Sequence, residues 1–268
     1  SSRKKSLVSR MGDLCLIVAF SGIYTIYGVQ DFGHIFQAIL LEESLLGNNT
    51  WIGWLIIFGA ILKSAQFPFH TWLPDTMGAP TPVSALMHAG IINGGGYLVV
   101  RLSPVLVHIP GALHMLAIVG ALTAVYASMV MLSQTSVKRA LAYSTIAQMG
   151  FMLLQCGLGA FHLAVLHLVA HSLYKGHAFL SCGSAVETAK KLNAKPHYAK
   201  LKPSRIWLAI GVSFAIVVGL SISFNVSPSD KPGMLVLSMV LVMALTQLLW
   251  TAMRRGQSGI AFAGATGV

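Results

Sequence analysis

The stretch LKSAQFPFHTWLPDTMGAPTPVSALMHAG, residues 62–90, determines how this sequence can fold. It holds four prolines, at Pro68, Pro74, Pro80 and Pro82. Proline lacks a backbone donor and disfavours helix in the residue before it, so no regular helix can run through the stretch. Two interpretations fit. It is either irregular backbone that is buried or lines a cavity, as in broken transporter helices, or an ordinary cytoplasmic loop.

The composition around this stretch is that of a membrane protein. Of the 268 residues, 55% are hydrophobic and only 9% are charged, whereas soluble domains carry about 25% charged residues. The net charge of +11 reflects 18 Lys and Arg against 7 Asp and Glu. Because these basic residues cluster between apolar runs, they indicate membrane topology and not nucleic-acid binding.

Eight apolar runs approach the length of about 20 residues that a membrane-spanning helix needs. They predict an all-α, polytopic membrane fold, with residues 1–268 forming a single transmembrane domain. The predicted spans are residues 11–28, 51–67, 82–100, 112–132, 141–158, 161–182, 206–224 and 233–252.

The distribution of basic residues agrees with eight spans. With this count, both ends of the chain and the even-numbered connections lie on one side of the membrane. That side receives the basic clusters at 3–10, 138–139, 190–205 and 254–255. Basic loops mark the cytoplasm, so we predict that both ends of this chain are cytoplasmic, with a basic cytoplasmic loop at 185–205.

Lys63 is the charged residue near the end of the second span. One interpretation is a lysine whose head reaches the near interface. The other is a lysine turned into the protein, where it could switch between charged and neutral as a proton carrier must. No acidic residue lies in the middle of a span. We therefore expect the carboxylate that balances Lys63 to lie upstream of this chain or in another subunit.

The sixth span carries His167, His171 and Lys175 at i, i+4 and i+8. This spacing places them on one helical face over about 12 Å. His88 adds a titratable group in the third span. We call this row of His167, His171 and Lys175 the stripe. It predicts a proton relay, and ordinary packing is the alternative. A zinc site is disfavoured because the His pair lacks a third ligand and an adjacent glutamate.

Other residues of the chain have structural or orienting roles in this interpretation. Arg10 and Asp13 stand three apart at the start of the first span, where an ion pair would ease their entry into the interface. Pro68, Pro74 and Asp75 shape the interrupted stretch. The three cysteines have no CxxC spacing, so neither a metal site nor a disulfide framework is expected.

Three stretches resemble one family in order and spacing. They are residues 62–90, VKRALAYSTIAQMGFML at 137–153 and HLVAHSLYKGHAFLSCGS at 167–184. They are similar to the proton-antiporter-like membrane subunits of respiratory complex I and of the Mrp cation/proton antiporters. HAGIINGGG at 88–96, followed by YLVVRLSP, is most similar to DabB, the membrane subunit of inorganic-carbon accumulation complexes. The resemblance covers about residues 3–190.

The resemblance implies an antiporter-like fold with a helix broken near Lys63. Lys63, His88, His167, His171 and Lys175 match the family's proton path, and the glutamate that pairs with the Lys63 position falls upstream of residue 1. It also implies a cation-translocating subunit, with the proton as the expected ion, that energises the conversion of CO2 to bicarbonate. The partner would be a cytoplasmic DabA-like zinc protein similar to carbonic anhydrases, and this chain itself would hold no cofactor.

Two alternatives stay open. The chain could instead be a proton-pumping subunit of complex I or of an Mrp antiporter, with other membrane subunits as partners. It could also be a structural membrane anchor. In each case we expect a multi-pass protein of a bacterial inner membrane, in contact with lipid and not with nucleic acid, that has no catalytic chemistry of its own. We also expect family helices upstream of residue 1.

Overall fold

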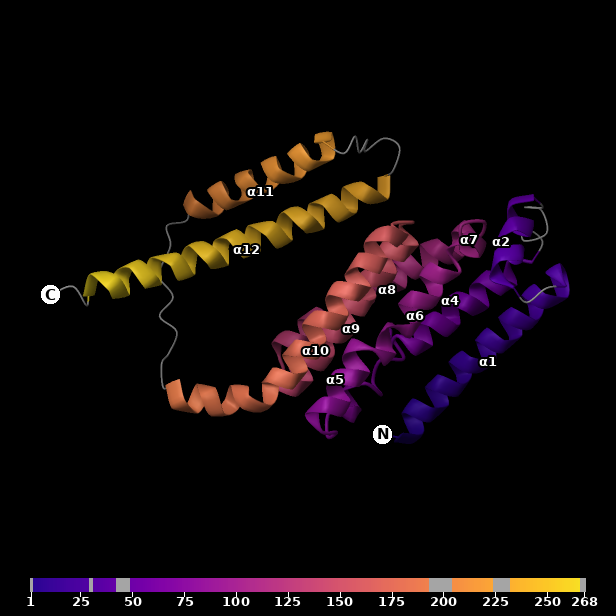
Figure 1. Cartoon of the computed structure of the whole chain (residues 1–268), viewed down its shortest axis with the longest axis horizontal. Helices are drawn as coiled ribbons and strands as arrows, with labels where there is room; N and C mark the ends of the chain where they lie inside the picture. Colours follow the sequence, from indigo (N-terminus) through magenta and orange to yellow (C-terminus); the bar gives the residue numbers. More distant parts are fainter. Residues whose placement is uncertain (1, 29–30, 42–48, 193–203, 224–231, 266–268) are drawn as a thin grey trace. The chain divides into compact units, whose positions relative to one another are not determined.

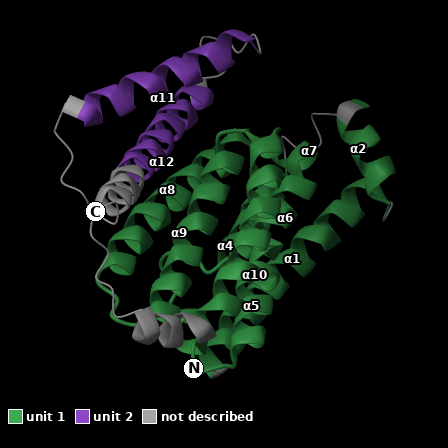
Figure 2. Ribbon diagram, turned by 60° about the vertical axis from the view of Figure 1, so that its left-hand side comes forward, with its two compact units in different colours: residues 1–188 green, residues 189–268 purple. Residues whose placement is uncertain are grey.

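The computed structural model describes residues 2–28, 31–41, 49–192, 204–223 and 232–265. Within these ranges the secondary structure is helical, so the predicted all-α class is confirmed. The helices form two compact units, residues 1–188 and 189–268 (Figure 2).

Unit 1 holds the helices on which the site is built (Figure 1). Its elements are α1 (Ser2–Tyr27), α2 (Phe32–Leu41), α4 (Trp51–Lys63), the 3-10 helix η1 (Pro74–Thr76), α5 (Thr81–Ala89), the 3-10 helix η2 (Ile91–Asn93), α6 (Gly94–Arg101), α7 (Ser103–Leu106), α8 (Pro110–Leu132), α9 (Val137–Gly157) and α10 (Phe161–Leu192). In unit 2, α11 (Ser204–Ser223) packs against α12 (Pro232–Ala265).

Pro74, Pro80 and Pro82 lie at the starts of helices, and Pro68 lies in the turns between α4 and η1. After α4 ends at Lys63 the chain forms turns, and Pro74 begins η1. Pro80 precedes α5, and Pro82 lies in its first turn, where a missing N–H costs no helical hydrogen bond. The stretch is not an ordinary surface loop, because Gln66, Trp72 and other side chains within it are buried.

Two predicted boundaries are wrong. The second span was predicted to reach residue 67, but α4 ends at Lys63. The third predicted span, 82–100, agrees with the segment Thr81–Arg101, within which the chain passes through Gly90 and η2 between α5 and α6. The predicted loop 185–205 begins later, since α10 continues to Leu192 through residues that favour helix, such as Glu187 and Lys190. Residues 193–203 of that loop lie outside the described ranges.

Five helical segments of the described residues are long and apolar enough to cross a membrane. They are Arg3–Tyr27, Thr81–Arg101, Pro110–Leu132, Arg205–Ser223 and Gly233–Met253. α4 is apolar but shorter, with 13 residues. The count of eight spans therefore stays a prediction. Large apolar side chains on outward faces, such as Leu132, Trp207 and Ile222, suit contact with lipid or with other membrane segments.

The most extensive helix contact in unit 1 is the seam between α8 and α9 (Figures 1 and 2). A Cβ atom added to Gly150 would lie 2.7 Å from the carbonyl oxygen of Gly120 and 2.8 Å from the backbone nitrogen of Ala124. Real Cβ atoms do not approach backbone this closely, so glycine at both positions permits the close approach. This seam fixes α9, which contacts α10 through Ser144 and Gln155.

We predict that Gly150→Ala destabilises the protein, because the added methyl group must push α8 and α9 apart. Overpacking of this kind costs about 1–3 kcal/mol. Gly94→Ala is the matched control, since a Cβ there meets nothing within 4 Å. The measurement is the thermal unfolding of both variants in detergent. Equal melting temperatures would contradict the packing of the seam.

Candidate functional site

The helix break after Lys63 is fixed by hydrogen bonds within the protein. Ala65 has a φ of +49°, in the left-handed region, a conformation that costs a residue with a side chain about 1–2 kcal/mol. The amide of Phe67 donates to the hydroxyl of Thr123 on α8 (3.1 Å). The hydroxyl of Ser64 donates to the carbonyl of Ile92 (3.1 Å), which lies in the second break, at η2. The two interrupted helices therefore meet at their breaks.

Lys63 forms an ion pair with Asp13 of α1. The expectation that no carboxylate of this chain balances Lys63 is therefore wrong. The cause is close packing of α1 on α4, where a Cβ on Gly12 would lie 3.4 Å from the Cβ of Leu62. The Lys63 side chain is 30% exposed and that of Asp13 is 51% exposed, so the pair lies at the edge of the described protein and not at its centre.

The predicted ion pair between Arg10 and Asp13 does not form. Within the described residues, the acidic partners of ion pairs are Asp13, with Lys63, and Asp31, with His34. Arg10 is exposed. Asp13 turns instead toward α4, a contact between helices that the i, i+3 spacing could not indicate.

Lys175 is among the largest fully buried side chains of the described residues, with 0% exposure. Its Nζ donates to the hydroxyl of Ser144 (2.7 Å) and points toward the carbonyl of Leu141 (3.4 Å), both on α9. No carboxylate pairs with it among the described residues. A charged ammonium group in this position would thus be solvated by two neutral oxygen atoms.

The histidines of α10 continue from Lys175 along one face, as predicted. His171 is buried, and neither of its ring nitrogens has a hydrogen-bond partner among the described residues. The rings of His171 and His167 lie 6.2 Å apart. His167 Nδ1 contacts Oε1 of Gln155 on α9 (3.0 Å). Because an amide oxygen only accepts, Nδ1 of His167 carries the proton of this bond.

His88 joins this group from α5. Its buried ring stacks on Phe179 of α10, with 4.4 Å between ring centroids. It interacts electrostatically with Lys175 and His171, and neither of its nitrogens has a hydrogen-bond partner in the described part of the chain. The structure therefore brings His88, His167, His171 and Lys175 together, whereas Lys63 pairs with Asp13 on another helix.

Three residues of the site were not predicted. Ser144 contacts Lys175 at one end of the stripe, and Gln155 contacts His167 at the other end. Asn93, at the second break, donates to Ser172 of α10 (2.8 Å) and to the carbonyl of Ala89 (2.7 Å). Gln155 and Asn93 are polar residues inside apolar runs, and this position could have indicated that they make polar contacts within the protein. Ser144 gave none, because a serine is common in a helix of this kind.

Pro68, Pro74 and Asp75, which were predicted to shape the interrupted stretch, differ in their surroundings. Pro68 is exposed and follows a cis peptide bond, whereas Pro74 is buried. Asp75 is exposed and lines a polar surface depression of about 650 Å³ together with Lys138 and Arg139. It therefore lies at the predicted cytoplasmic surface and away from the buried histidines.

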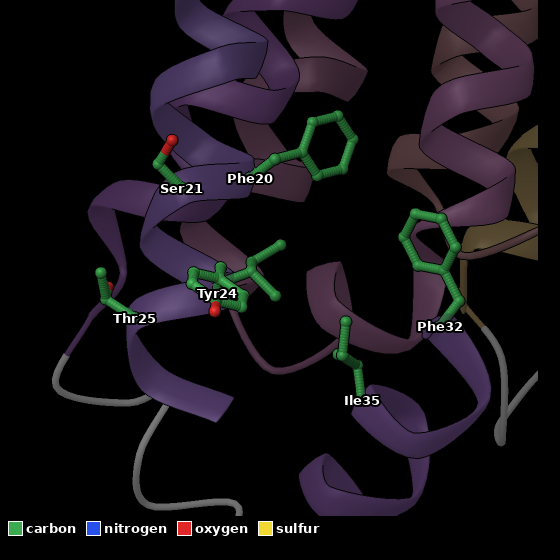
Figure 3. Close-up of a pocket in the computed structure, with 7 residues that line it drawn as sticks. Phe20, Ser21, Tyr24, Thr25, Phe32 and Ile35 are labelled. Atoms are coloured by element: carbon green, nitrogen blue, oxygen red, sulfur yellow. The ribbon is translucent and has the colours of Figure 1, made fainter. Parts of the chain in front are cut away.

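A further depression of about 450 Å³ lies at the end of α1 and beside α2 (Figure 3). Its lining is mostly apolar, with Phe20, Tyr24, Phe32 and Ile35 among its residues. It contains no His, Lys, Asp or Glu, so the candidate site is not placed there. In the described residues, no three His, Cys, Asp or Glu side chains are grouped to hold a metal ion.

Comparison with known proteins shows the family to which the chain is related. The family described as NADH:quinone oxidoreductase/Mrp antiporter, TM matches residues 1–251. The chain is 47% identical over 221 residues to the "Probable inorganic carbon transporter subunit DabB1" of Halothiobacillus neapolitanus, covering 78% of this chain and 40% of that protein. It is 42% identical over 257 residues to the "Probable inorganic carbon transporter subunit DabB" of Hydrogenovibrio crunogenus, covering 96% of this chain and 48% of that protein.

Among solved structures, the chain is similar to the Mrp complex from Dietzia sp. DQ12-45-1b. The TM-score is 0.64 at 31% identity, over 79% of this chain and 24% of that chain. This chain belongs to the NADH:quinone oxidoreductase/Mrp antiporter family of membrane proteins. It spans less than half of the length of the two curated relatives named above.

We predict that a disulfide forms between Gly12→Cys and Leu62→Cys, because their Cβ atoms would lie 3.4 Å apart, close to disulfide geometry. Cys15, Cys156 and Cys182 are first replaced. The control pairs Leu14→Cys with Leu62→Cys, since Leu14 is 61% exposed on another face of α1. The bond is measured by mass spectrometry after mild oxidation. Equal cross-linking in both pairs would contradict the register that places Asp13 beside Lys63.

Proposed function

We propose that this chain is the core of a proton-translocating membrane subunit that energises inorganic-carbon accumulation. The observation that carries the proton path is the fully buried Lys175, which contacts Ser144 and Leu141 and has no carboxylate partner among the described residues. A charge buried in this way is expensive. Lysine, unlike arginine, can avoid that cost by releasing its proton. A residue that gains and loses a proton at membrane depth is what a proton path requires.

The groups next to Lys175 favour protons over sodium. Sodium is a hard cation that needs several oxygen ligands, whereas the described groups along the stripe are mainly imidazole and amine nitrogens. His167, His171 and His88 each carry an imidazole ring, which can accept a hydrogen bond at one ring nitrogen and donate one from the other. Their order along α10 and α5 provides successive stations for one proton.

The packing-only alternative explains the buried histidines less well. Buried polar groups in folded proteins are nearly always hydrogen-bonded. Both ring nitrogens of His88 and His171 have no partner among the described residues. Residues retained only for packing would be expected to satisfy these atoms or to be apolar.

The proposed partner is a cytoplasmic zinc protein of the carbonic-anhydrase type, which would hydrate CO2 to bicarbonate. The support is similarity along 96% of this chain to a protein named as a probable inorganic carbon transporter subunit. Zinc chemistry would belong to the partner. We place the protein in a bacterial inner membrane with both ends of this chain cytoplasmic, because its basic clusters then share the cytoplasmic face.

A second candidate function is that of an Mrp-type antiporter subunit. The similarity to the Mrp complex from Dietzia, at 31% identity, favours it. The two functions share the proton path and differ in the partner. Purification of the complex distinguishes them, because a large soluble zinc protein differs from a set of further membrane subunits.

We predict that Lys63→Arg and Lys63→Ala each lower proton flux at least tenfold, with the complex still assembled. Arginine preserves the ion pair with Asp13 but does not release its proton, and alanine has no titratable group. Flux is measured in liposomes with a pH-sensitive dye, alongside co-purification of the partner. Lys4→Arg, at an exposed position of α1, is the control and should transport normally.

An active Lys63→Arg variant would give Lys63 a different role. It would remove Lys63 from the proton path and leave it as one half of an ion pair that holds α1 against α4.

We predict that the basic stretch from Lys190 to Arg205 binds the soluble partner. Replacing Lys195, Lys200, Lys202 and Arg205 together by Glu should weaken the complex, and the remaining binding should become less sensitive to salt. The measurement is partner recovery in a pull-down at several salt concentrations. The control is the replacement of Arg3 and Lys4, which also lie on the predicted cytoplasmic face, by Glu. Unchanged recovery from the quadruple variant would show that docking occurs elsewhere.

A further inference from the structure

A third depression, of about 430 Å³, lies beside the turn that joins α8 to α9. Gln134, Thr135 and Ser136 line it at the turn, and Leu141, Ser144 and Tyr174 line it farther along the helices. Leu141 and Ser144 are the residues whose oxygen atoms contact Nζ of Lys175. Two residues that line this depression therefore also contact a fully buried lysine.

The depression reaches well below the turn. Ser144 lies seven residues after Val137, the first residue of α9, which is about 10 Å along the helix axis. Ser144 is partly exposed, whereas Lys175 behind it has no exposed surface. The hydroxyl group of Ser144 thus lies between the buried ammonium group of Lys175 and the depression beside the α8–α9 turn.

The two oxygen atoms that contact Lys175 differ in what they can do with a proton. The carbonyl of Leu141 only accepts a hydrogen bond. The hydroxyl of Ser144 accepts one and donates another. Ser144 can therefore receive a proton on one side while it gives one up on the other, and Leu141 cannot.

We infer that Ser144 is the residue through which Lys175 exchanges protons with water at the α8–α9 turn. The inference rests on the proposed proton path. In the outward step an N–H bond of the Lys175 ammonium breaks and its proton moves to Oγ of Ser144. The original hydroxyl proton of Ser144 leaves to a water molecule in the depression. Lys175 becomes neutral, serine is regenerated and the water becomes hydronium. The reverse sequence reloads Lys175.

This assignment indicates at which end of the stripe protons are exchanged with water. Lys175 contacts the second and third turns of α9, in the half of that helix that begins with the basic residues Lys138 and Arg139 of the predicted cytoplasmic face. His167 contacts Gln155, close to the other end of α9. Protons would therefore enter or leave at Lys175 on the side of the α8–α9 turn, and the histidines would lead away from that side.

Cysteine accessibility tests the depression without reference to transport. In the intact complex, with Cys15, Cys156 and Cys182 replaced, Ser144→Cys should react with a membrane-impermeant cationic methanethiosulfonate. It should react from the same side as Thr135→Cys and at least tenfold faster than Thr145→Cys, which is fully buried beside it. Reaction no faster than that of Thr145→Cys, or only from the opposite side to Thr135→Cys, would overturn the inference.

Proton flux then tests the exchange itself. Ser144→Ala should lower flux at least tenfold, and Ser144→Thr should restore most of it, because threonine keeps a hydroxyl group. Lys175→Gln should abolish flux. Normal flux in Ser144→Ala together with none in Lys175→Gln would overturn the role of Ser144 and leave the proposed function in place. Normal flux in Lys175→Gln would instead overturn the proton path through Lys175.

Discussion

The hydrogen bond from the hydroxyl of Ser64 to the carbonyl of Ile92 joins the two interrupted helices of this protein, and the site is arranged around it. Without water in the surroundings, every freed backbone group at a break must find a partner inside the protein. The break after α4 places Lys63 at a helix end, where Asp13 can reach it. The break at η2 releases Asn93 to bond Ser172 on α10, between His171 and Lys175. The same local interruptions thus position both lysines.

These positions follow partly from the sequence. The prolines from Pro68 to Pro82 predict the first break because their effect on the backbone is local and strong. The spacing of His167, His171 and Lys175 predicts their common face because helix geometry is regular. The second break was not predicted, since Gly90 and the three glycines after Asn93 are equally compatible with a continuous, closely packed helix. The α8–α9 seam likewise depends on which glycines face each other, and periodicity in one helix does not reveal this.

The contacts between helices account for the rest of what was missed. Asp13 lies 50 residues from Lys63 in the sequence, and Ser144 lies 31 residues from Lys175. A single sequence shows spacing within a helix but does not show which helix lies opposite. The interpretation of Arg10 and Asp13 as a pair was wrong for this reason, because it used the neighbour along the helix and ignored the one across from it. Buried polar residues in apolar runs, such as Gln155 and Asn93, were the clearest available evidence for contacts of this kind.

The buried group around Lys175 places a physical limit on its own charge. His88, His167, His171 and Lys175 are close together, and no described carboxylate pairs with them. Two unit charges about 6 Å apart repel by about 3 kcal/mol at an effective dielectric constant of about 20, which corresponds to a factor of roughly 100 in population. A second proton therefore enters this group with difficulty until the first has moved on. Single occupancy makes transfer stepwise, and it makes the charge state of the group sensitive to any nearby charge that a partner or a conformational change brings closer.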